Sequence, residues 1–428
     1  MTSSTPWRWI PTLYVGQGLP YVVVMTLSVV MYKNLGLSNT EIALYTSWLY
    51  LPWVIKPLWS PLVDLLGTKR RWIVVMQFVI GASLAGVALT LPGSQAVRLS
   101  LAVFWLMAFA SATHDIAADG FYLLALDPRR QAAFVGVRST FYRLAMIAGQ
   151  GGLVVLAGWL QDRTGQPALA WSFVFGGLAL AFVMAAAWHA WALPRPALDR
   201  PVPRGGSFWR DAGEVFAAFF RQPGIGRILA FLLLYRFAEA QALKLVTPFL
   251  LDSPAAGGLG LKTQDVGIAY GTVGVIALTL GGLLGGWVIS IGGLKRLLWP
   301  LMVAMHLPNL VFVALAAMQP GSLAWVSAAL ALEQFGYGFG FTAYMVFMLM
   351  VAGQGVHKTA HYALCTGFMA LGMMLPGMVA GWLQARLGYL GFFTWVCVAT
   401  LPSFAAAALV RIDPGFGRRE DDGDVSRR

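Results

Sequence analysis

The sequence predicts an all-α membrane protein in which twelve transmembrane helices form two pseudo-symmetric halves of six. Of its 428 residues, 58% are hydrophobic and 11% are charged, whereas a soluble domain needs about a quarter of charged residues to cover its surface. Apolar stretches of about 20 residues, enough to cross about 30 Å of hydrocarbon, recur along the chain. Segments of the first half are also repeated in the second, as in membrane proteins built from two homologous halves.

The expected spans follow one another closely along the chain. The 48 glycines and 22 prolines would interrupt soluble helices, but in membrane helices they permit close packing and local kinks. We expect spans over residues 10–31, 40–60, 72–92, 98–122, 136–159, 171–193, 226–250, 265–288, 296–318, 323–351, 360–384 and 389–410.

Two pairs of segments carry the internal repeat. Leu35–Ser47 (LGLSNTEIALYTS) aligns without gaps with LGLKTQDVGIAYGT, which begins at Leu259. Shortly after each copy, Ser60–Arg71 (SPLVDLLGTKRR) aligns with Gly286–Arg296 (GWVISIGGLKR). Because both copies occur in apolar surroundings, they indicate two homologous membrane halves.

The domain boundaries follow from this repeat and from one long connection. We expect a first half over 1–193, a cytoplasmic linker over 194–224, a second half over 225–412 and a disordered cytoplasmic tail over 413–428. The linker begins with four prolines and continues as SFWRDAGEVFAAFF, a pattern typical of an amphipathic helix on the inner membrane surface. The alternative for this segment is a plain linker.

The distribution of positive charge predicts the orientation in the membrane. Of the 30 Lys and Arg residues, 21 fall at the termini and in the even-to-odd connections, and five fall on the opposite face. By the positive-inside rule, both termini are then cytoplasmic. The net charge of +12 therefore reflects topology, and we expect no nucleic-acid partner.

Several classes of function are not supported by any motif. No P-loop, Gly-x-Ser-x-Gly or His-Glu-x-x-His pattern occurs, and two Cys and five His show no metal-ligand spacing. We therefore expect no enzyme activity, no cofactor and no metal. Nothing at the N-terminus reads as a cleavable signal, since Trp7 and Trp9 are typical of an interfacial belt.

The motif that ends the second span resembles the loop signature of the major facilitator superfamily, Gly-x-Leu-x-Asp-x-x-Gly-x-Lys/Arg. Here Ser60 replaces the first glycine, and Ser290 replaces the acidic residue in the second copy. A helix-end carboxylate beside a glycine turn and cations can hold neighbouring helices together; the alternative is a loop that only sets orientation. We expect a conformational latch formed by Asp64, Gly67, Lys69, Arg70, Gly293, Lys295 and Arg296.

Three later spans resemble one branch of that superfamily, which holds bacterial muropeptide permeases (AmpG type) and acetyl-CoA transporters. In the fourth span, ATHDIAADGFYLLAL, the branch's two aspartates correspond to Asp115 and Asp119, and His114 replaces the usual Gln. Glu333–Met345 resembles its Gly-rich tenth helix, and His357–Gly372 its eleventh. The resemblance implies the major facilitator fold, with spans one, four, seven and ten around a central cavity.

Ionisable residues inside the spans indicate the transport site, because each is unfavourable in hydrocarbon and should face a cavity or a partner. Asp115 and Asp119 are four residues apart and share one helix face. Arg143 in the fifth span lies at a depth close to that of Asp119. We expect Arg143 to pair with Asp119, which leaves Asp115 free to bind a proton.

The seventh and tenth spans extend this polar set. Arg236, Glu239 and Lys244 lie along about 12 Å of helix at about 1.5 Å per residue, and Glu333 lies near the midplane. The alternative is that such charges form structural ion pairs. We expect proton coupling by Asp115, Asp119, Glu239 and Glu333, with Asp115 first and Glu333 second. We expect the substrate cavity to include Gln17, His114, Arg143, Arg236, Lys244 and Tyr337.

Together these features predict a monomeric, multi-pass, proton-coupled permease of the bacterial inner membrane. The resemblance implies a bulky polar substrate, an anhydromuropeptide or related amino-sugar saccharide, that is imported by rocking of the two halves. A siderophore permease of the same branch is one alternative. A transporter-fold receptor or lipid scramblase without coupled transport is another.

The motif analysis predicts that Asp64 supports the conformational cycle and does not contact substrate. Asp64→Asn should slow transport and leave equilibrium substrate affinity nearly unchanged, because the residue lies at a helix end beside Gly67 and Lys69. Uptake rates and ligand affinity of the purified variant test this. A large loss of affinity in a folded variant would count against the latch.

Overall fold

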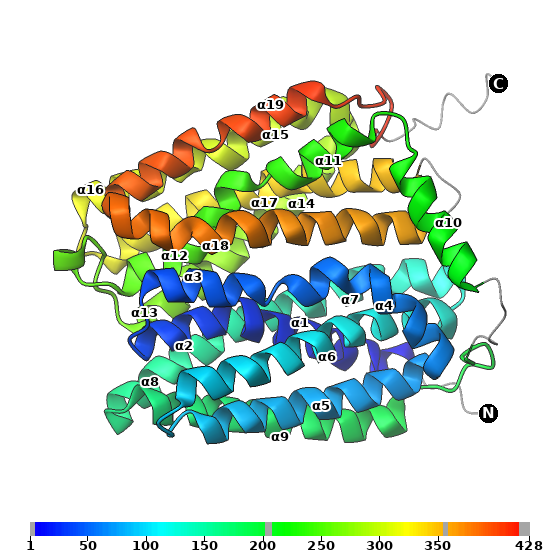
Figure 1. Cartoon of the computed structure of the whole chain (residues 1–428), viewed down its shortest axis with the longest axis horizontal. Helices are drawn as coiled ribbons and strands as arrows, with labels where there is room; N and C mark the ends of the chain where they lie inside the picture. The colour runs from blue at the N-terminus through cyan, green and yellow to red at the C-terminus, as the bar shows by residue number, and fades with distance from the viewer. Residues whose placement is uncertain (1–4, 202–207, 354–357, 419–428) are drawn as a thin grey trace.

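The computed structural model describes residues 5–201, 208–353 and 358–418, which form long helices and, within those residues, no strand (Figure 1). Short 3-10 turns are η1 (Pro6–Arg8), η4 (Pro254–Ala256) and η6 (Leu307–Asn309). Segments of wider π-helix are η2 (Val23–Leu27), η3 (Ala148–Leu153) and η5 (Gly267–Gly274). The α-helices of the first half are α1 (Ile10–Val22), α2 (Ser28–Asn34), α3 (Asn39–Trp48), α4 (Leu51–Leu66), α5 (Lys69–Thr90), α6 (Ala96–Ala125), α7 (Pro128–Ile147), α8 (Val154–Thr164) and α9 (Pro167–Ala192).

The remaining helices follow the connection between the halves. They are α10 (Phe208–Phe220), α11 (Ile225–Leu234), α12 (Phe237–Leu251), α13 (Thr263–Val266), α14 (Val275–Gly292), α15 (Leu294–His306), α16 (Leu310–Met318), α17 (Leu323–Gly353), α18 (Lys358–Val398) and α19 (Leu401–Leu409). Helix α10 lies within the segment for which an amphipathic helix was expected.

The helices account for the predicted crossings. Within the described ranges, nine continuous helical segments are long and apolar enough to cross a membrane. One of them, Ala360–Leu409, holds two crossings separated by a bend at Gly388, where φ is 66°. Two further crossings are each built from two helices, α3 with α4 and α11 with α12. The predicted all-α membrane fold is confirmed, and the arrangement is consistent with twelve spans.

The two halves lie side by side, with α1–α9 in the lower part of Figure 1 and most of α11–α19 in the upper part. Helix α10 runs across one end of the bundle, and we refer to the opposite end as the far end. Each half has its own apolar core. In the first half Phe104, Trp171 and Phe175 are fully buried, and in the second Phe231, Leu301 and Tyr344 are.

The two halves make close backbone contacts at glycines, which have no side chain to keep the helices apart. A Cβ on Gly271 of η5 would clash with the Gln150 carbonyl of η3, and a Cβ on Gly158 of α8 would clash with Gln264 of α13. Helix α3 packs in the same way on α18, because a Cβ on Gly381 would clash with Asn39. Small residues thus allow the backbones of the two halves to touch.

In each half, the segment that follows the sixth span forms hydrogen bonds with the latch motif of that half. In the first, the Asp199 carboxylate accepts the backbone N–H groups of Lys69 (2.7 Å) and Arg70 (3.1 Å) at the start of α5. In the second, Phe416 accepts the backbone N–H of Leu294 at 3.0 Å, beside Gly293 with φ of 75°. Part of the expected tail, residues 413–418, is therefore tied to the second motif.

The other latch residues take different positions. The Arg70 side chain donates to the carbonyls of Leu193 and Ala190 at the end of α9. Lys295 and Arg296 are exposed. The side chain of Asp64 lies outside the described residues, so its latch role stays a prediction.

Helices α14 and α17 form a close crossing inside the second half. A Cβ on Gly281 would clash with the Phe335 carbonyl, one on Gly285 with the Phe339 carbonyl, and one on Gly338 with the Leu278 carbonyl. Such a spacing of small residues lets two membrane helices pack backbone against backbone.

Gly281→Leu should therefore destabilise the second half, since overpacking of a close contact costs about 1–3 kcal/mol. Thermal unfolding of the purified protein measures the effect, and the variant should unfold at a lower temperature than the parent. Gly177→Leu is the matched control, because a Cβ there has nothing within 4 Å. Equal unfolding temperatures for the two variants would refute the predicted crossing.

Candidate functional site

The predicted residue Asp115 lies between three helices of the first half. Its Oδ2 accepts the Trp53 Nε1–H of α4 at 3.1 Å and lies 4.0 Å from the Lys56 Nζ. Gln17 of α1, expected in the substrate cavity, also contacts this carboxylate. The Tyr21 ring packs edge-on against the Trp53 ring, with 5.4 Å between the ring centres. Two aromatic side chains therefore lie on this side of the site.

Asp119 does not pair with Arg143, and that prediction is wrong. Arg138 lies 2.8 Å from the Asp119 Oδ1 instead, and its guanidinium stacks over the rings of Tyr14 (4.7 Å) and Tyr122 (5.5 Å). Depth along a helix gives the height of a side chain but not its direction. Five residues correspond to about 500° of rotation, so Arg143 points about 140° away from Arg138.

Arg143 instead reaches the other half. Its Nη1 lies 3.4 Å from the Thr279 Oγ1 on α14, to which it donates, and Gly282 of the same helix leaves room beside its guanidinium. Arg143 therefore contributes to the contact between the halves.

The second half provides a buried cluster around Arg236. This residue occupies the break between α11 and α12, with φ of −109°. Its guanidinium donates to the Tyr337 hydroxyl and lies over the rings of Tyr337 (5.3 Å) and Phe341 (4.8 Å). Discontinuous helices with a charged residue at the break are typical of transporter binding sites.

Two buried carboxylates follow, of which Glu239 lies close to Arg236 and Glu333 lies close to Glu239. Glu239 is fully buried, and neither of its oxygens has a hydrogen-bond partner among the described residues. Glu333 is also buried and accepts the Gln334 Nε2–H at 2.9 Å. The two carboxylates are near enough to repel each other, and Arg236 attracts Glu239.

Lys244, expected in the substrate cavity, contacts the first half. Its ammonium donates to the Thr46 Oγ1 of α3 at 3.0 Å and lies 5.0 Å from the centre of the Tyr50 ring. No ion pair joins it to Glu333 among the described side chains. Lys244 thus connects α12 of the second half with α3 of the first.

His114 lies apart from the Asp115 group, in a buried hydrogen-bonded chain within the first half. Its Nε2 lies 3.0 Å from the Gln77 Nε2, the Gln77 Oε1 lies 2.8 Å from the His189 Nδ1, and the His189 Nε2 lies 2.9 Å from the Thr12 Oγ1. This chain links α1, α5, α6 and α9. In the part of the chain that the structure describes, no three His, Cys, Asp or Glu side chains are grouped so that they could hold a metal ion.

The structure therefore brings together Gln17 with Asp115, Arg236 with Tyr337 and Glu239, and Glu239 with Glu333. It separates His114 and Arg143 from these two groups. Arg138 was not predicted as the partner of Asp119, because it was counted among the basic residues of a connection that set the orientation in the membrane. Its spacing of five from Arg143 offered no signal that would have distinguished the two.

Comparisons with known proteins agree with this architecture. Residues 17–235, just over half of the chain, match the BT1 family. The chain is 26% identical over 375 residues to the "Anhydromuropeptide permease" of Escherichia coli K12, covering 86% of this chain and 72% of that protein. It is 25% identical over 404 residues to the "Putative transporter AmpG 4" of Rickettsia conorii, covering 90% and 92%.

Solved structures of major facilitators share the fold. The nucleoside transporter NupG superposes with a TM-score of 0.67 at 16% identity, covering 96% of this chain and 100% of that chain. A D-xylose-proton symporter superposes with a TM-score of 0.64 at 13% identity, covering 98% and 99%. The resemblance to the major facilitator superfamily and to its muropeptide-permease branch is confirmed. The protein is a multi-pass membrane transporter with the major facilitator fold, and it belongs to the BT1 family.

Proposed function

We propose that this transporter is a proton-coupled permease that imports a bulky polar solute, an anhydromuropeptide or a related amino-sugar saccharide. The solute class is supported by the similarity to the anhydromuropeptide permease over most of both chains. In this proposal the α10 end faces the cytoplasm, the far end faces outward, and the protein is a monomer in the bacterial inner membrane. The concentration of basic residues in the even-to-odd connections supports that orientation.

The observation that carries proton coupling is the pair Glu239 and Glu333. Two carboxylates buried in one site repel each other when both are ionised, and binding of a proton relieves that repulsion. Glu239 has no hydrogen-bond donor among the described residues to stabilise its negative charge. Each acid has a cation nearby, Arg236 for Glu239 and Lys56 for Asp115, but Asp115 also accepts a hydrogen bond from Trp53. The geometry therefore favours Glu239 and Glu333 over Asp115, the first candidate from the sequence.

The side chains around these acids suit an amino sugar that bears a peptide. Tyr21 and Trp53 line the Asp115 group, and Tyr337 and Phe341 stack on Arg236. Aromatic faces pack on sugar rings, and a guanidinium binds a carboxylate in a bidentate manner. A ferric siderophore is the second candidate, because it too is bulky and polar.

Uptake by purified protein in liposomes tests this function. With an imposed inward proton gradient, labelled anhydromuropeptide should accumulate above its external concentration, and a protonophore should abolish the accumulation. Liposomes without protein and a labelled ferric siderophore are the comparisons. Accumulation that survives the protonophore would exclude proton coupling, and accumulation of the siderophore alone would exclude the proposed substrate.

Substitution of the carboxylates identifies the proton carrier. Glu239→Gln should abolish uphill accumulation but retain exchange of labelled for unlabelled solute, because exchange needs no net proton movement. Asp115→Asn should retain some accumulation if Glu239 and Glu333 carry the proton. Glu214→Gln, whose parent side chain is 71% exposed on α10, is the matched control and should accumulate solute normally. Full accumulation by Glu239→Gln, together with its loss in Asp115→Asn, would return the role to Asp115.

A further inference from the structure

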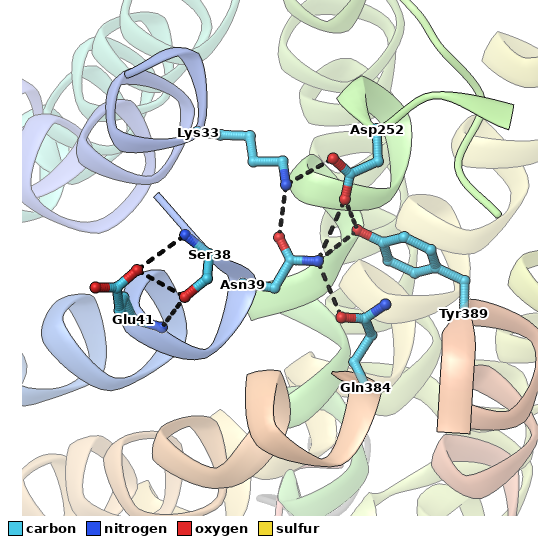
Figure 2. Close-up of polar contacts among 7 residues, drawn as sticks. All are labelled: Lys33, Ser38, Asn39, Glu41, Asp252, Gln384 and Tyr389. Atoms are coloured by element: carbon cyan, nitrogen blue, oxygen red, sulfur yellow. Dashed lines mark hydrogen bonds and ion pairs between the residues drawn. The ribbon is translucent and has the colours of Figure 1, made fainter. Parts of the chain in front are cut away.

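The far ends of the two halves are joined by a hydrogen-bonded group, which we call the charged clamp (Figure 2). The Lys33 Nζ lies 2.6 Å from the Asp252 Oδ1 and donates to the Asn39 Oδ1 at 2.8 Å. The Tyr389 hydroxyl donates to the Asp252 Oδ2 at 2.6 Å, and the Asn39 amide donates to Asp252, Gln384 and Tyr389. Lys33 and Asn39 belong to the first half, and the other three residues belong to the second.

A second group, the neutral clamp, joins the halves nearby. The Asn34 Oδ1 accepts from Gln161 (2.8 Å) and Trp171 (3.0 Å), and its amide donates to the Thr263 Oγ1 at 3.0 Å. Thr263 in turn donates to the Gln161 Oε1 at 3.0 Å. Here only Thr263 comes from the second half.

The two clamps contain residues that are aligned in the internal repeats. Asn39 and Thr263 are aligned in the first repeat, and each is the first residue of its helix, α3 or α13. Gln161 and Gln384 occupy the same position in a further repeat, GWLQDRTG (158–165) and GWLQARLG (381–388). Both copies end in a glycine with positive φ, 65° and 66°, and in both an arginine stacks on the tryptophan, at 5.0 and 4.1 Å. The copies differ in charge, since only one contains an ion pair.

A cavity of about 300 Å³ lies between the clamps. Its lining includes Lys33 and Asp252 of the charged clamp and Asn34 of the neutral clamp. Asp162 and Lys262 also line it, 3.9 Å apart with side chains 53% and 67% exposed, so both remain accessible to solvent. The volume is at the lower end of the range of small-molecule sites, about 300–1,000 Å³.

We propose that this cavity is an outer docking site for a carboxylate group of the solute, and that docking releases the charged clamp. The inference rests on the proposed import function, because it takes the far end as the outer end. A carboxylate in the cavity competes with Asp252 for Lys33 and with Asp162 for Lys262.

The hydrogen bonds of Asp252 make this exchange feasible. After losing Lys33, its carboxylate keeps donors from Asn39 and Tyr389, so it is not left buried without a partner. Lys33 meanwhile exchanges one carboxylate for another. The neutral clamp contains no ion pair that a carboxylate could replace. The ligand is therefore expected to release the charged clamp and to leave the neutral clamp in place.

Spin labels on the far ends of both halves test the proposal. Cysteines replace the exposed Ser94 and Ala255, while Cys365 and Cys397 are changed to Ser, and the full chain is placed in lipid nanodiscs. The probes are alanylalanine and its C-terminal amide, which differ only in the carboxylate. The free acid should lengthen the distance between the labels at a concentration about tenfold lower than the amide, as loss of a charged hydrogen-bond partner predicts.

Variants separate docking from a general loosening of the contact. Lys33→Gln should lengthen the distance without probe and lose the preference for the free acid. Asn34→Ala, in the neutral clamp, should also lengthen the distance but keep that preference. Lys262→Gln, whose parent side chain is exposed, leaves the clamps intact and should reduce the preference about threefold.

Two results would overturn the docking site: equal responses to acid and amide, or an unchanged preference in Lys33→Gln and Lys262→Gln. The label distances do not depend on uptake, so failure of the two proposals can be told apart. A free-acid response without accumulation of any solute contradicts the proposed function alone. Accumulation with no distinction between the probes contradicts the docking site alone.

Discussion

A charged side chain inside a bilayer needs a partner or a polar surrounding, because isolation in hydrocarbon is unfavourable by about 2.5–3.5 kcal/mol or more. Four cations, Lys56, Arg143, Arg236 and Lys244, lie at least four residues inside the ends of the expected spans, and all four have partners. Lys56 lies near Asp115, and Arg236 binds Tyr337. Arg143 and Lys244 reach threonine hydroxyls in the opposite half.

The choice of neutral partners for the two bridging cations matters for transport. A carboxylate partner would hold the halves together strongly and would be left unpaired when they separate. A threonine hydroxyl can be replaced by water or by a solute oxygen at little loss in free energy. The contacts of Arg143 and Lys244 therefore position the halves without fixing them, which a rocking mechanism requires.

Much of this arrangement could be predicted from the sequence, because apolar spans and repeated segments are patterns of consecutive residues. The span positions follow from residue type, and the two-fold organisation follows from the repeated segments. The partner of Asp119 could not be predicted in this way, since Arg138 and Arg143 differ in direction around α7. The clamps were missed for another reason. Lys33 and Asp252 are ordinary residues at span ends, and the repeats mark only Asn39 and Gln384 of the charged clamp.

The contact between Phe416 and Leu294 has a practical consequence for work on this protein. Residues 410–418, which follow α19, are a structural part of the second half, because Phe416 supplies the acceptor for the first free N–H of α15. Affinity tags or fluorescent fusions joined directly after α19 would remove that acceptor and expose the turn at Gly293. Attachment after Arg418 leaves the contact intact and keeps the reporter at the same end of the bundle as α10.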